Sequence, residues 1–270
     1  MRTGGAFLLI GLMLAAPPTL VAAEHPSLAK ARALYNAGDY DGAITAAAAA
    51  RSDPASADAA ALVTGRAHLE RFRVAPSDPA DLAAAREALS AARMAALLPR
   101  DQVDLLVGFG QALFLTNAFG AAAELFDSAL ARAGMLPYRD RVLLLDWWAT
   151  AIDREAHGLQ PDRRAAALER VVSRMGEELA ADPGHPTANY WLAVAVRGTG
   201  DLERAWHAAV AGWVRAPLRP DAAGTLRQDI DRFMTTVLIP ERARIRPARD
   251  QTAALAELTS QWDAVKDQWK

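Results

Sequence analysis

Residues 186–217 read PTANYWLAVAVRGTGDLERAWHAAVAGWVRAP, and this stretch decides the fold. Two segments with apolar residues at helical spacing flank a short turn that contains Gly198 and Gly200. Glycine tolerates the positive φ that a tight turn needs, and Asp201 can cap the helix that follows. Pro217 closes the unit because proline cannot continue a helical hydrogen-bond ladder. The stretch therefore predicts two helices joined by a tight turn.

This unit resembles one tetratricopeptide repeat (TPR), a helix–turn–helix module of about 34 residues. A second copy of the pattern occupies residues 28–54, where YNAGDYDGAI resembles the turn of the repeat and the start of its second helix. In this copy Gly38 corresponds to Gly200, and Ala43 corresponds to Ala205. Several copies favour a repeat protein over a single helical hairpin.

Three further copies lie between these two. The second copy is broken by an insertion near residues 72–80, where two prolines exclude a continuous helix. Its second helix is expected over residues 81–98. The third copy spans 101–134 and has Phe126 at the large-residue position of its second helix. The fourth copy, residues 140–181, diverges most from the repeat pattern.

The resemblance implies an all-α fold, with a right-handed solenoid of about five helical hairpins over residues 24–220 and a helical cap over 221–270. Pro240 either ends one helix of the cap or begins another short one. A solenoid exposes an apolar end, so we interpret the terminal helix as a cap, with docking of a partner as the alternative. The apolar face of this helix would consist of Leu255, Leu258, Trp262, Val265 and Trp269.

The first residues predict an export signal over residues 1–23. Arg2 precedes a short apolar run at 7–16, and small residues precede a cut after Ala23. The apolar run is too short for a comfortable membrane span. The chain contains no cysteine, which excludes a lipid-attachment cysteine and a disulfide. The mature protein is expected to be periplasmic, not a lipoprotein, and without an integral membrane span.

Motifs that carry chemistry are missing from the sequence. His68 and Glu70 are not followed by the second histidine of a zinc-protease helix. No nucleophile elbow, phosphate loop or dinucleotide fingerprint occurs. The five histidines are scattered, and the net charge of −2 gives no footprint for nucleic acid. We expect no enzyme activity, no cofactor, no metal site and no nucleic-acid partner.

The resemblance implies a binding groove, because in TPR proteins the first helix of each pair lines a concave groove that takes peptides or helices of partners. The residues at these positions mix aromatic rings with arginines, which are enriched in interface hot spots. Arginine can hold a carboxylate with two hydrogen bonds, so an acidic or C-terminal peptide end is a candidate ligand. The expected partner-binding residues are Arg32, Tyr35, Arg66, Gln111, Phe114, Trp148, Glu155, Tyr190 and Arg197. The apolar residues of the same lining are Leu28, Leu62, Leu69, Val107, Leu145, Ile152 and Val194.

The same residues also have a plainer interpretation. Trp148 and Tyr190 are as consistent with core packing as with ligand contact. Arg66 and Arg197 could be solvated or paired with nearby acids, and a surface pair of that kind contributes only about 0–1 kcal/mol. An aromatic residue at helical spacing usually belongs to a core. We expect core packing for Trp147, Trp191, Trp206 and Trp213.

The leading hypothesis is a periplasmic TPR scaffold or adaptor that binds another protein or peptide in an envelope, secretion or transport assembly. The alternative is a carrier whose tryptophan-lined pocket holds a small solute or lipid, which an apolar cavity near Trp148 would favour. An enzyme without a recognisable motif is a remote third interpretation. The sequence does not identify the partner, and self-association through the terminal helix stays open.

Overall fold

The computed structural model of this protein describes residues 24–74, 78–218 and 225–270, and every regular element in these ranges is a helix. The predicted signal peptide, the centre of the predicted insertion and the start of the predicted cap lie outside the described residues. The α-helices are α1 (Pro26–Asn36), α2 (Tyr40–Ala50), α3 (Ala57–Val74), α4 (Pro79–Ala91), α5 (Pro99–Leu115), α6 (Phe119–Leu130), α7 (Tyr138–His157), α8 (Pro161–Ala181), α9 (Pro186–Gly198), α10 (Leu202–Arg215), α11 (Leu226–Phe233), α12 (Ile239–Arg244) and α13 (Gln251–Gln268).

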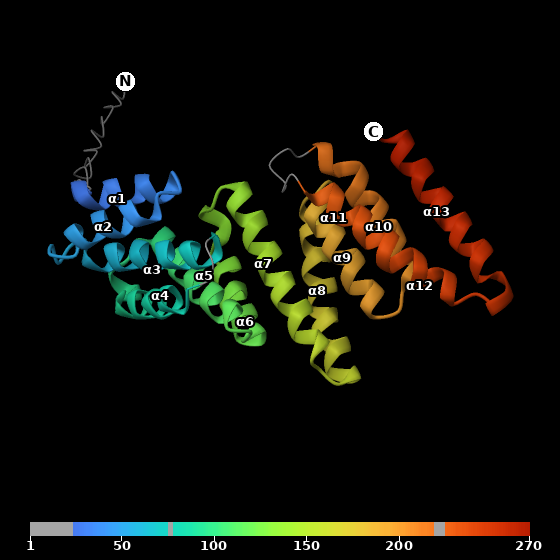
Figure 1. The fold of residues 1–270 in the computed structure, drawn as a ribbon, viewed down its shortest axis with the longest axis horizontal. Coiled ribbons are helices and arrows are strands. Elements are labelled where there is room, and N and C mark those ends of the chain that lie inside the picture. Colours follow the sequence, from blue (N-terminus) through green and yellow to red (C-terminus); the bar gives the residue numbers. More distant parts are fainter. Residues whose placement is uncertain (1–23, 75–77, 219–224) are drawn as a thin grey trace, which may run out of the picture.

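Neighbouring helices pack in pairs along the chain. The pairs are α1 with α2, α3 with α4, α5 with α6, α7 with α8, and α9 with α10. The second helix of each pair also packs on the first helix of the next pair. Figure 1 shows the pairs following one another along the long axis of the molecule, from α1 at one end to α13 at the other. The predicted all-α fold, built from neighbouring helical hairpins, is confirmed.

The turns inside three of the pairs use a residue with a left-handed backbone conformation. Gly38 has φ of 80°, Gly200 has φ of 96°, and Asn117 has φ of 61° at the matching turn of the third pair. Glycine and asparagine are the residues that adopt this conformation most readily. Asp39 and Asp201 then cap α2 and α10, each accepting a hydrogen bond of 2.9 Å from the backbone N–H three residues later.

The core lies between successive helices, and small residues set how closely they approach. Ala43, Ala85 and Ala205 on second helices are fully buried. At Gly110 of α5, an added Cβ would lie 2.5 Å from the nearest ring atom of Phe126 on α6. Only a residue without a side chain fits at that separation, so Gly110 lets the large Phe126 ring fill the third pair.

The second helix of the second pair is shorter than predicted. We expected a helix over residues 81–98, but α4 ends at Ala91 and a 3-10 turn, η1 (Met94–Ala96), follows. Ala92 has left the helix with ψ of 117°, and the backbone N–H of Arg93 donates to Asp58 Oδ1 of α3 at 2.7 Å. The Arg93 side chain bonds the same carboxylate. The hydrogen bonds between Arg93 and Asp58 therefore end α4 earlier than the sequence around residues 81–98 predicts.

Pro240 lies in the first turn of a short helix, α12, which is one of the two predicted alternatives. A π-helical turn, η4 (Met234–Leu238), joins α11 to α12, so the helical backbone continues across this point. Proline lacks an N–H group and crowds the preceding turn, and the wider π turn accommodates both effects. α13 packs against α12, and of its predicted apolar face only Trp262 is buried.

Candidate functional site

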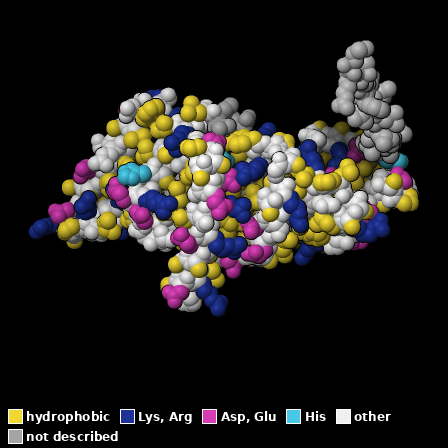
Figure 2. All heavy atoms as spheres, turned by 180° about the vertical axis from the view of Figure 1, so that it is seen from behind, with side chains coloured by type: hydrophobic (Ala, Val, Ile, Leu, Met, Phe, Trp, Pro, Cys, Tyr) yellow, Lys and Arg dark blue, Asp and Glu magenta, His cyan; other side chains and the backbone are white. Residues whose placement is uncertain are grey.

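The first helices of the pairs, α1, α3, α5, α7 and α9, carry a set of polar and aromatic side chains, several of which contact one another locally. We call this set the first-helix face. Packing joins α1 to α3, α3 to α5, and α7 to α9. Its members are Arg32, Tyr35, Arg66, Arg73, Asp101, Asp104, Phe114, Asp146, Trp147, Asp153, Tyr190 and Arg197. Figure 2 shows one side of the whole molecule, on which acidic, basic and hydrophobic side chains are intermixed rather than gathered by charge.

At the α1 end of this face, Arg32 is held by two carboxylates. Its guanidinium donates to both carboxylate oxygens of Asp101 on α5, at 3.0 and 2.8 Å, and to Glu24 at 2.8 Å. Asp101 is almost fully buried. The bidentate pair therefore ties α1 to α5 across α3, and Arg32 is already engaged within the chain.

Arg66 lies deeper and extends over the backbone of α5. A Cβ at Gly108 would lie 3.2 Å from Arg66 Cδ, so glycine leaves the space that this side chain crosses. Arg66 Nη2 donates to the hydroxyl of Tyr35 at 3.3 Å, whereas its Nη1 is buried without a hydrogen-bond partner. Burial raises the pKa of the nearby Asp104 carboxyl, and the charge of Arg66 partly offsets this shift. The predicted residues Tyr35 and Arg66 are thus brought together.

In the middle of the face, aromatic rings from three helices, α5, α6 and α7, meet. Phe114 of α5 stands edge-on to Trp147 of α7, with ring centroids 5.0 Å apart, and also to Phe119 at 5.1 Å. Arg73, in the last turn of α3, lies over the Trp147 ring with its guanidinium carbon 5.1 Å from the centroid. Trp147 is half-buried. Phe114, one of the predicted lining residues, therefore contacts Trp147 of the next helical pair.

The prediction that Trp148 lines the groove is wrong. Trp148 is 2% exposed and belongs to the central core, and Leu145 and Ile152 from the expected lining are buried there too. Trp147, for which we expected core packing, is the more accessible ring. Helix α7 is thus rotated by about one residue, roughly 100°, from the register that the repeat pattern suggested.

Two further predicted residues have structural roles. Gln111 is buried on α5 and is 4% exposed, with no hydrogen-bond partner for its Oε1 atom. Glu155 Oε2 accepts a hydrogen bond from the backbone N–H of Gly120 at 3.0 Å, which satisfies the first turn of α6. Neither side chain is free for a partner in this arrangement. Of the remaining apolar lining, Leu28, Leu62 and Leu69 are also buried.

Tyr190 on α9 lies at the centre of an acidic part of the face. Its ring packs edge-on against Trp191 and Phe233, with centroids 5.2 and 6.3 Å away. Burial, together with the charges of Asp229, Asp146 and Asp153, raises the pKa of Tyr190 to about 12. The hydroxyl therefore stays protonated at neutral pH and can donate a hydrogen bond.

The carboxylates around Tyr190 have few partners among the described residues. Asp146 accepts one hydrogen bond, from the indole Nε1 of Trp191 at 2.8 Å. Asp153 lies 3.7 Å from His157 Nδ1. Burial raises the pKa of both Asp146 and Asp153. We did not predict these acids, although their spacing of seven residues places them on one face of α7 with Trp147 between them in sequence.

Arg197, also predicted for the groove, is paired with an acid from the terminal segment. Its Nε donates to Glu241 Oε2 of α12 at 2.7 Å, and a second contact joins Nη2 to Oε1. The hydrogen bonds from Arg197 hold the pKa of Glu241 below its usual range. The guanidinium is therefore part of the junction between α9 and α12, and it is about two-thirds covered.

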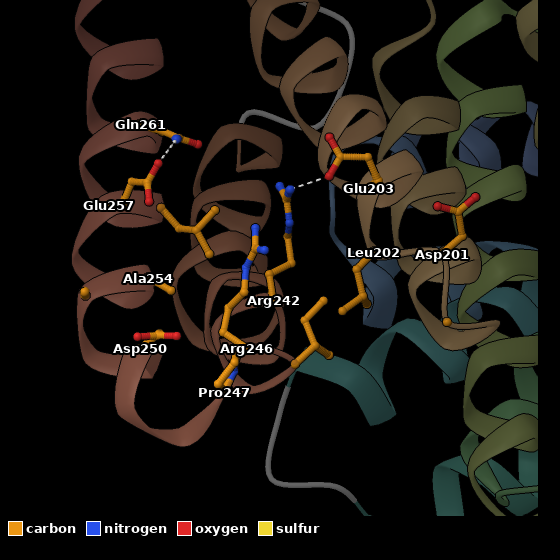
Figure 3. A pocket seen from close by; sticks show the side chains of 14 residues that line it. Asp201, Leu202, Glu203, Arg242, Arg246, Pro247, Asp250, Ala254, Glu257 and Gln261 are labelled. Atoms are coloured by element: carbon orange, nitrogen blue, oxygen red, sulfur yellow. Dashed lines mark hydrogen bonds and ion pairs between the residues drawn. The ribbon is translucent and has the colours of Figure 1, made fainter.

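Two open hollows lie beside this junction. The Arg197 hollow, of about 730 Å³, is bounded by Asp153, His157, Val194, Arg197 and Ile245, with other residues of α8 and α12. The α13 hollow, of about 800 Å³, lies between the α9–α10 turn and the first half of α13. Figure 3 shows Arg242 and Arg246 within it, with Arg242 contacting Glu203. Neither hollow has a tryptophan in its lining.

Within residues 24–74, 78–218 and 225–270, no three His, Cys, Asp or Glu side chains are grouped so that they could hold a metal ion. Across the same described ranges, no helix has the length and apolar composition that crossing a bilayer requires. No family model, curated protein or solved structure matches the chain. Membership of the TPR family therefore stays a prediction from the sequence pattern.

Proposed function

We propose that this protein is an exported TPR-like scaffold, with the right-handed superhelix of that family, and that it binds a segment of another protein along the first-helix face. The observation that carries this proposal is a set of half-buried aromatic rings on four of the five first helices, α1, α5, α7 and α9: Tyr35, Phe114, Trp147 and Tyr190. Half-buried aromatic rings offer apolar area at little cost in conformational entropy, as binding hot spots do.

The arginines of the face support the proposal in a different way from the one the sequence suggested. Arg32 and Arg197 are each bound to a carboxylate of the chain, so they are not free to hold a peptide carboxylate. They fix the relative positions of α1, α5, α9 and α12. A rigid surface binds with a smaller entropic penalty than one that must be ordered by its partner.

The charge around Tyr190 favours a basic partner side chain at this end of the face. Asp146, Asp153 and Asp229 lie around the ring. Arg232 lies 3.6 Å from Asp229 and offsets part of this charge, whereas no lysine or arginine contacts Asp146 within the described residues. A lysine or arginine of the partner could contact the Tyr190 ring and neutralise these acids. We therefore propose that the bound segment combines apolar residues near Trp147 with a basic residue near Tyr190.

Export to the periplasm is part of the proposal and rests on the first 23 residues of the sequence alone. Mass spectrometry of the protein from its own cells measures the mature N-terminus. A mature chain that begins at Glu24 supports export and cleavage, whereas a retained Met1 would overturn this part.

The binding proposal is tested with the chain from Glu24 as bait in an extract of its own cell envelope. The test variant is Trp147→Ala with Tyr190→Ala, which removes two rings of the first-helix face. The control variant is Met135→Ala with Leu218→Ala, because both side chains are exposed apolar residues outside the first helices. Circular dichroism and thermal unfolding establish that all three baits are folded.

A protein retained by the wild type and by the control variant, but lost with the test variant, supports binding along the first-helix face. Its binding segment should contain lysine or arginine, and replacing that residue should weaken retention. A prey retained equally by all three baits would place the interface elsewhere. Copurification of a small molecule without any protein would favour the carrier alternative.

A further inference from the structure

Helix α13 has one deeply buried side chain, beside which the half-buried Leu258 and Val265 pack against the same core. Trp262 is fully buried, and it is the only buried residue of this helix. Its ring lies edge-on to Trp206 at 6.4 Å and to Trp213 at 5.2 Å, both on α10. Its indole Nε1 donates to Asp231 of α11 at 2.7 Å. We call Trp206, Trp213 and Asp231 the anchor site.

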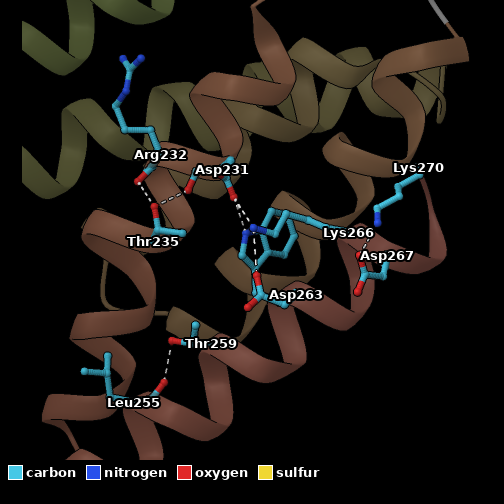
Figure 4. Close-up of polar contacts among 10 residues, drawn as sticks. Asp231, Arg232, Thr235, Leu255, Thr259, Asp263, Lys266, Asp267 and Lys270 are labelled. Carbon is cyan, nitrogen blue, oxygen red and sulfur yellow. Dashed lines mark hydrogen bonds and ion pairs between the residues drawn. The ribbon is translucent and has the colours of Figure 1, made fainter.

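The polar contacts of the α13 segment with α11 gather around the same point. Lys266 lies one turn beyond Trp262, with its Nζ 3.1 Å from Asp231 and 3.0 Å from Asp263, as Figure 4 shows. Arg227 of α11 donates to the backbone oxygen of Trp269 at 2.6 Å. These contacts lie in the second half of α13, so that half carries the attachment to the anchor site.

The first half of α13 stands away from the preceding helical pair. The α13 hollow, of about 800 Å³, separates Ala254, Glu257 and Leu258 from the turn between α9 and α10. Leu255, on this half, is 42% exposed. Leu258 of this half packs against the central core. The other contacts of this half are with α12 and with the connecting segment, where Gln251 Nε2 donates to the backbone oxygens of Arg244 and Arg246.

The segment that joins α12 to α13, residues 245–250, is exposed along its length. It starts with Ile245, which is 71% exposed, and contains Pro247. An exposed connector with no buried side chain can change direction without disturbing a core. Local opening of an element that is held by few buried contacts needs less free energy than unfolding of the whole chain.

We propose that α13 exchanges between two copies of this chain, so that Trp262 of each copy occupies the anchor site of the other. The anchor site already holds Trp262, which donates to Asp231, and Lys266 lies one turn later in the same helix. A second copy of this chain carries the same two residues at the same spacing, so it is the partner that fits the site. Exchange keeps every contact of Trp262 and Lys266, and domain swapping of this kind is a low-cost route to a two-fold dimer.

The exchanged arrangement also accounts for apolar surface that the single chain leaves exposed. In a two-fold dimer the connecting segments of the two copies lie beside each other near the symmetry axis. Ile245, which is 71% exposed in the single chain, lies in this segment, and covering it at the axis would favour the dimer over two separate chains. This inference does not depend on the proposed function, because α13 lies outside the first-helix face.

The test uses the full chain, whose lack of cysteine gives no background reaction. One sample carries Arg227→Cys and the other carries Trp269→Cys, with tags of different mass. The two samples are incubated together at high concentration, diluted, and treated with a short bismaleimide crosslinker. Positions 227 and 269 lie side by side only when α13 is docked on α11. A crosslink that joins an Arg227→Cys chain to a Trp269→Cys chain therefore shows that α13 of one copy is docked on the other.

Three controls make the result decisive. A chain that carries both cysteines should crosslink within itself at low concentration, which establishes that the reagent spans the two positions. A mixture of Met135→Cys with Trp269→Cys reports random collision, because Met135 is exposed and lies far along the chain in η2 (Ala133–Met135). Adding Trp262→Ala to the Trp269→Cys chain should abolish the heterodimer, with helicity retained.

A heterodimer above the level of the collision control, lost with Trp262→Ala, supports exchange of α13. No heterodimer above that level, when the double-cysteine chain does crosslink within itself, overturns the proposal. Dimers detected by light scattering in that second case would associate through other surfaces and would also count against exchange.

Discussion

Arg73 of α3 lies over the indole ring of Trp147 of α7, with its guanidinium carbon 5.1 Å from the ring centroid. The two residues belong to helical pairs that are separated in sequence by the third pair. Glu70 holds the same guanidinium with two hydrogen bonds of 3.0 and 2.8 Å. This contact places the end of α3 beside the middle of the first-helix face, and it makes Trp147 the ring on which the proposed binding is best tested.

Replacing Trp148 should mainly lower stability, whereas replacing the adjacent Trp147 should mainly weaken binding. Trp148→Ala empties a site in the core and should lower the free energy of unfolding by about 3–5 kcal/mol. Trp147→Ala removes contacts with Phe114 and Arg73 at a half-buried position and should cost about 1–2 kcal/mol. Urea unfolding of both variants measures these losses, and retention of the partner measures binding.

The critical outcome is which variant loses partner retention and which loses stability. We expect Trp147→Ala to weaken partner retention while its fold is kept, and Trp148→Ala to change stability first. A Trp148→Ala variant as stable as wild type would show that this ring is not in the core. The Met135→Ala variant, changed at an exposed position, should differ from wild type in neither measurement.

The register of α7 shows where prediction from the sequence failed. The repeat pattern was extended to the fourth pair, where its match is weakest, and it placed Trp148 outward. The local spacing contains the correct signal, because Val142, Leu145, Trp148 and Ile152 step by three, three and four along one apolar face. The face with Trp147 carries polar residues such as Arg154. Local periodicity was more reliable here than the distant resemblance.

The helical pairs themselves could be predicted, because their signals are local. The turns at Gly38 and Gly200 and the caps at Asp39 and Asp201 depend on the residues at those positions. The end of α4 could not be predicted, since it depends on the bond from Arg93 to Asp58 across 35 residues. The acids around Tyr190 were missed for the same reason, because α7, α9 and α11 meet only in the fold.

Gly110 should be intolerant of even one added carbon. A Cβ there would lie 2.5 Å from the ring of Phe126, which is buried on all sides. Gly110→Ala should therefore lower the free energy of unfolding by about 1–3 kcal/mol, as overpacking does. Adding Phe126→Leu should recover part of the loss if the ring is the cause. Urea unfolding of the single and double variants measures both effects.

Gly176 of α8 is the matched control for this substitution. It also lies inside a helix, but no atom lies within 4 Å of an added Cβ. Gly176→Ala should leave stability unchanged or raise it by up to about 1 kcal/mol, because alanine is the better helix former. Equal losses at Gly110 and Gly176 would show that the separation of α5 and α6 is not what the Gly110 substitution disturbs.

Asp146→Asn should stabilise the protein at neutral pH. Burial raises the folded-state pKa of Asp146, so its protonated form is favoured by folding, and this contribution is lost as pH rises through the raised pKa. Asparagine keeps an oxygen that can accept from Trp191 and carries no charge. The variant should exceed wild type in stability at about pH 7 and match it at about pH 3, below the ordinary aspartate pKa.

The same substitution separates binding from stability. If a basic residue of the partner contacts the acids around Tyr190, Asp146→Asn should weaken partner retention although the free protein is more stable. Urea unfolding across the pH range gives the first quantity and retention in the bait assay gives the second. A variant that is less stable than wild type at neutral pH would contradict the assigned burial of this carboxylate.

Glu241→Gln should have the opposite effect on stability. Hydrogen bonds from Arg197 lower the folded-state pKa of Glu241, so the contribution of the pair is present above the ordinary glutamate pKa and is lost as pH falls through the lowered value. Because both side chains are partly exposed, the expected loss at about pH 7 is about 1 kcal/mol. The difference from wild type should shrink as pH falls through the lowered folded-state pKa of Glu241, because the carboxylate then becomes protonated. A loss at neutral pH that does not shrink on acidification would show that packing of α12, rather than the charge pair with Arg197, is what the substitution removes.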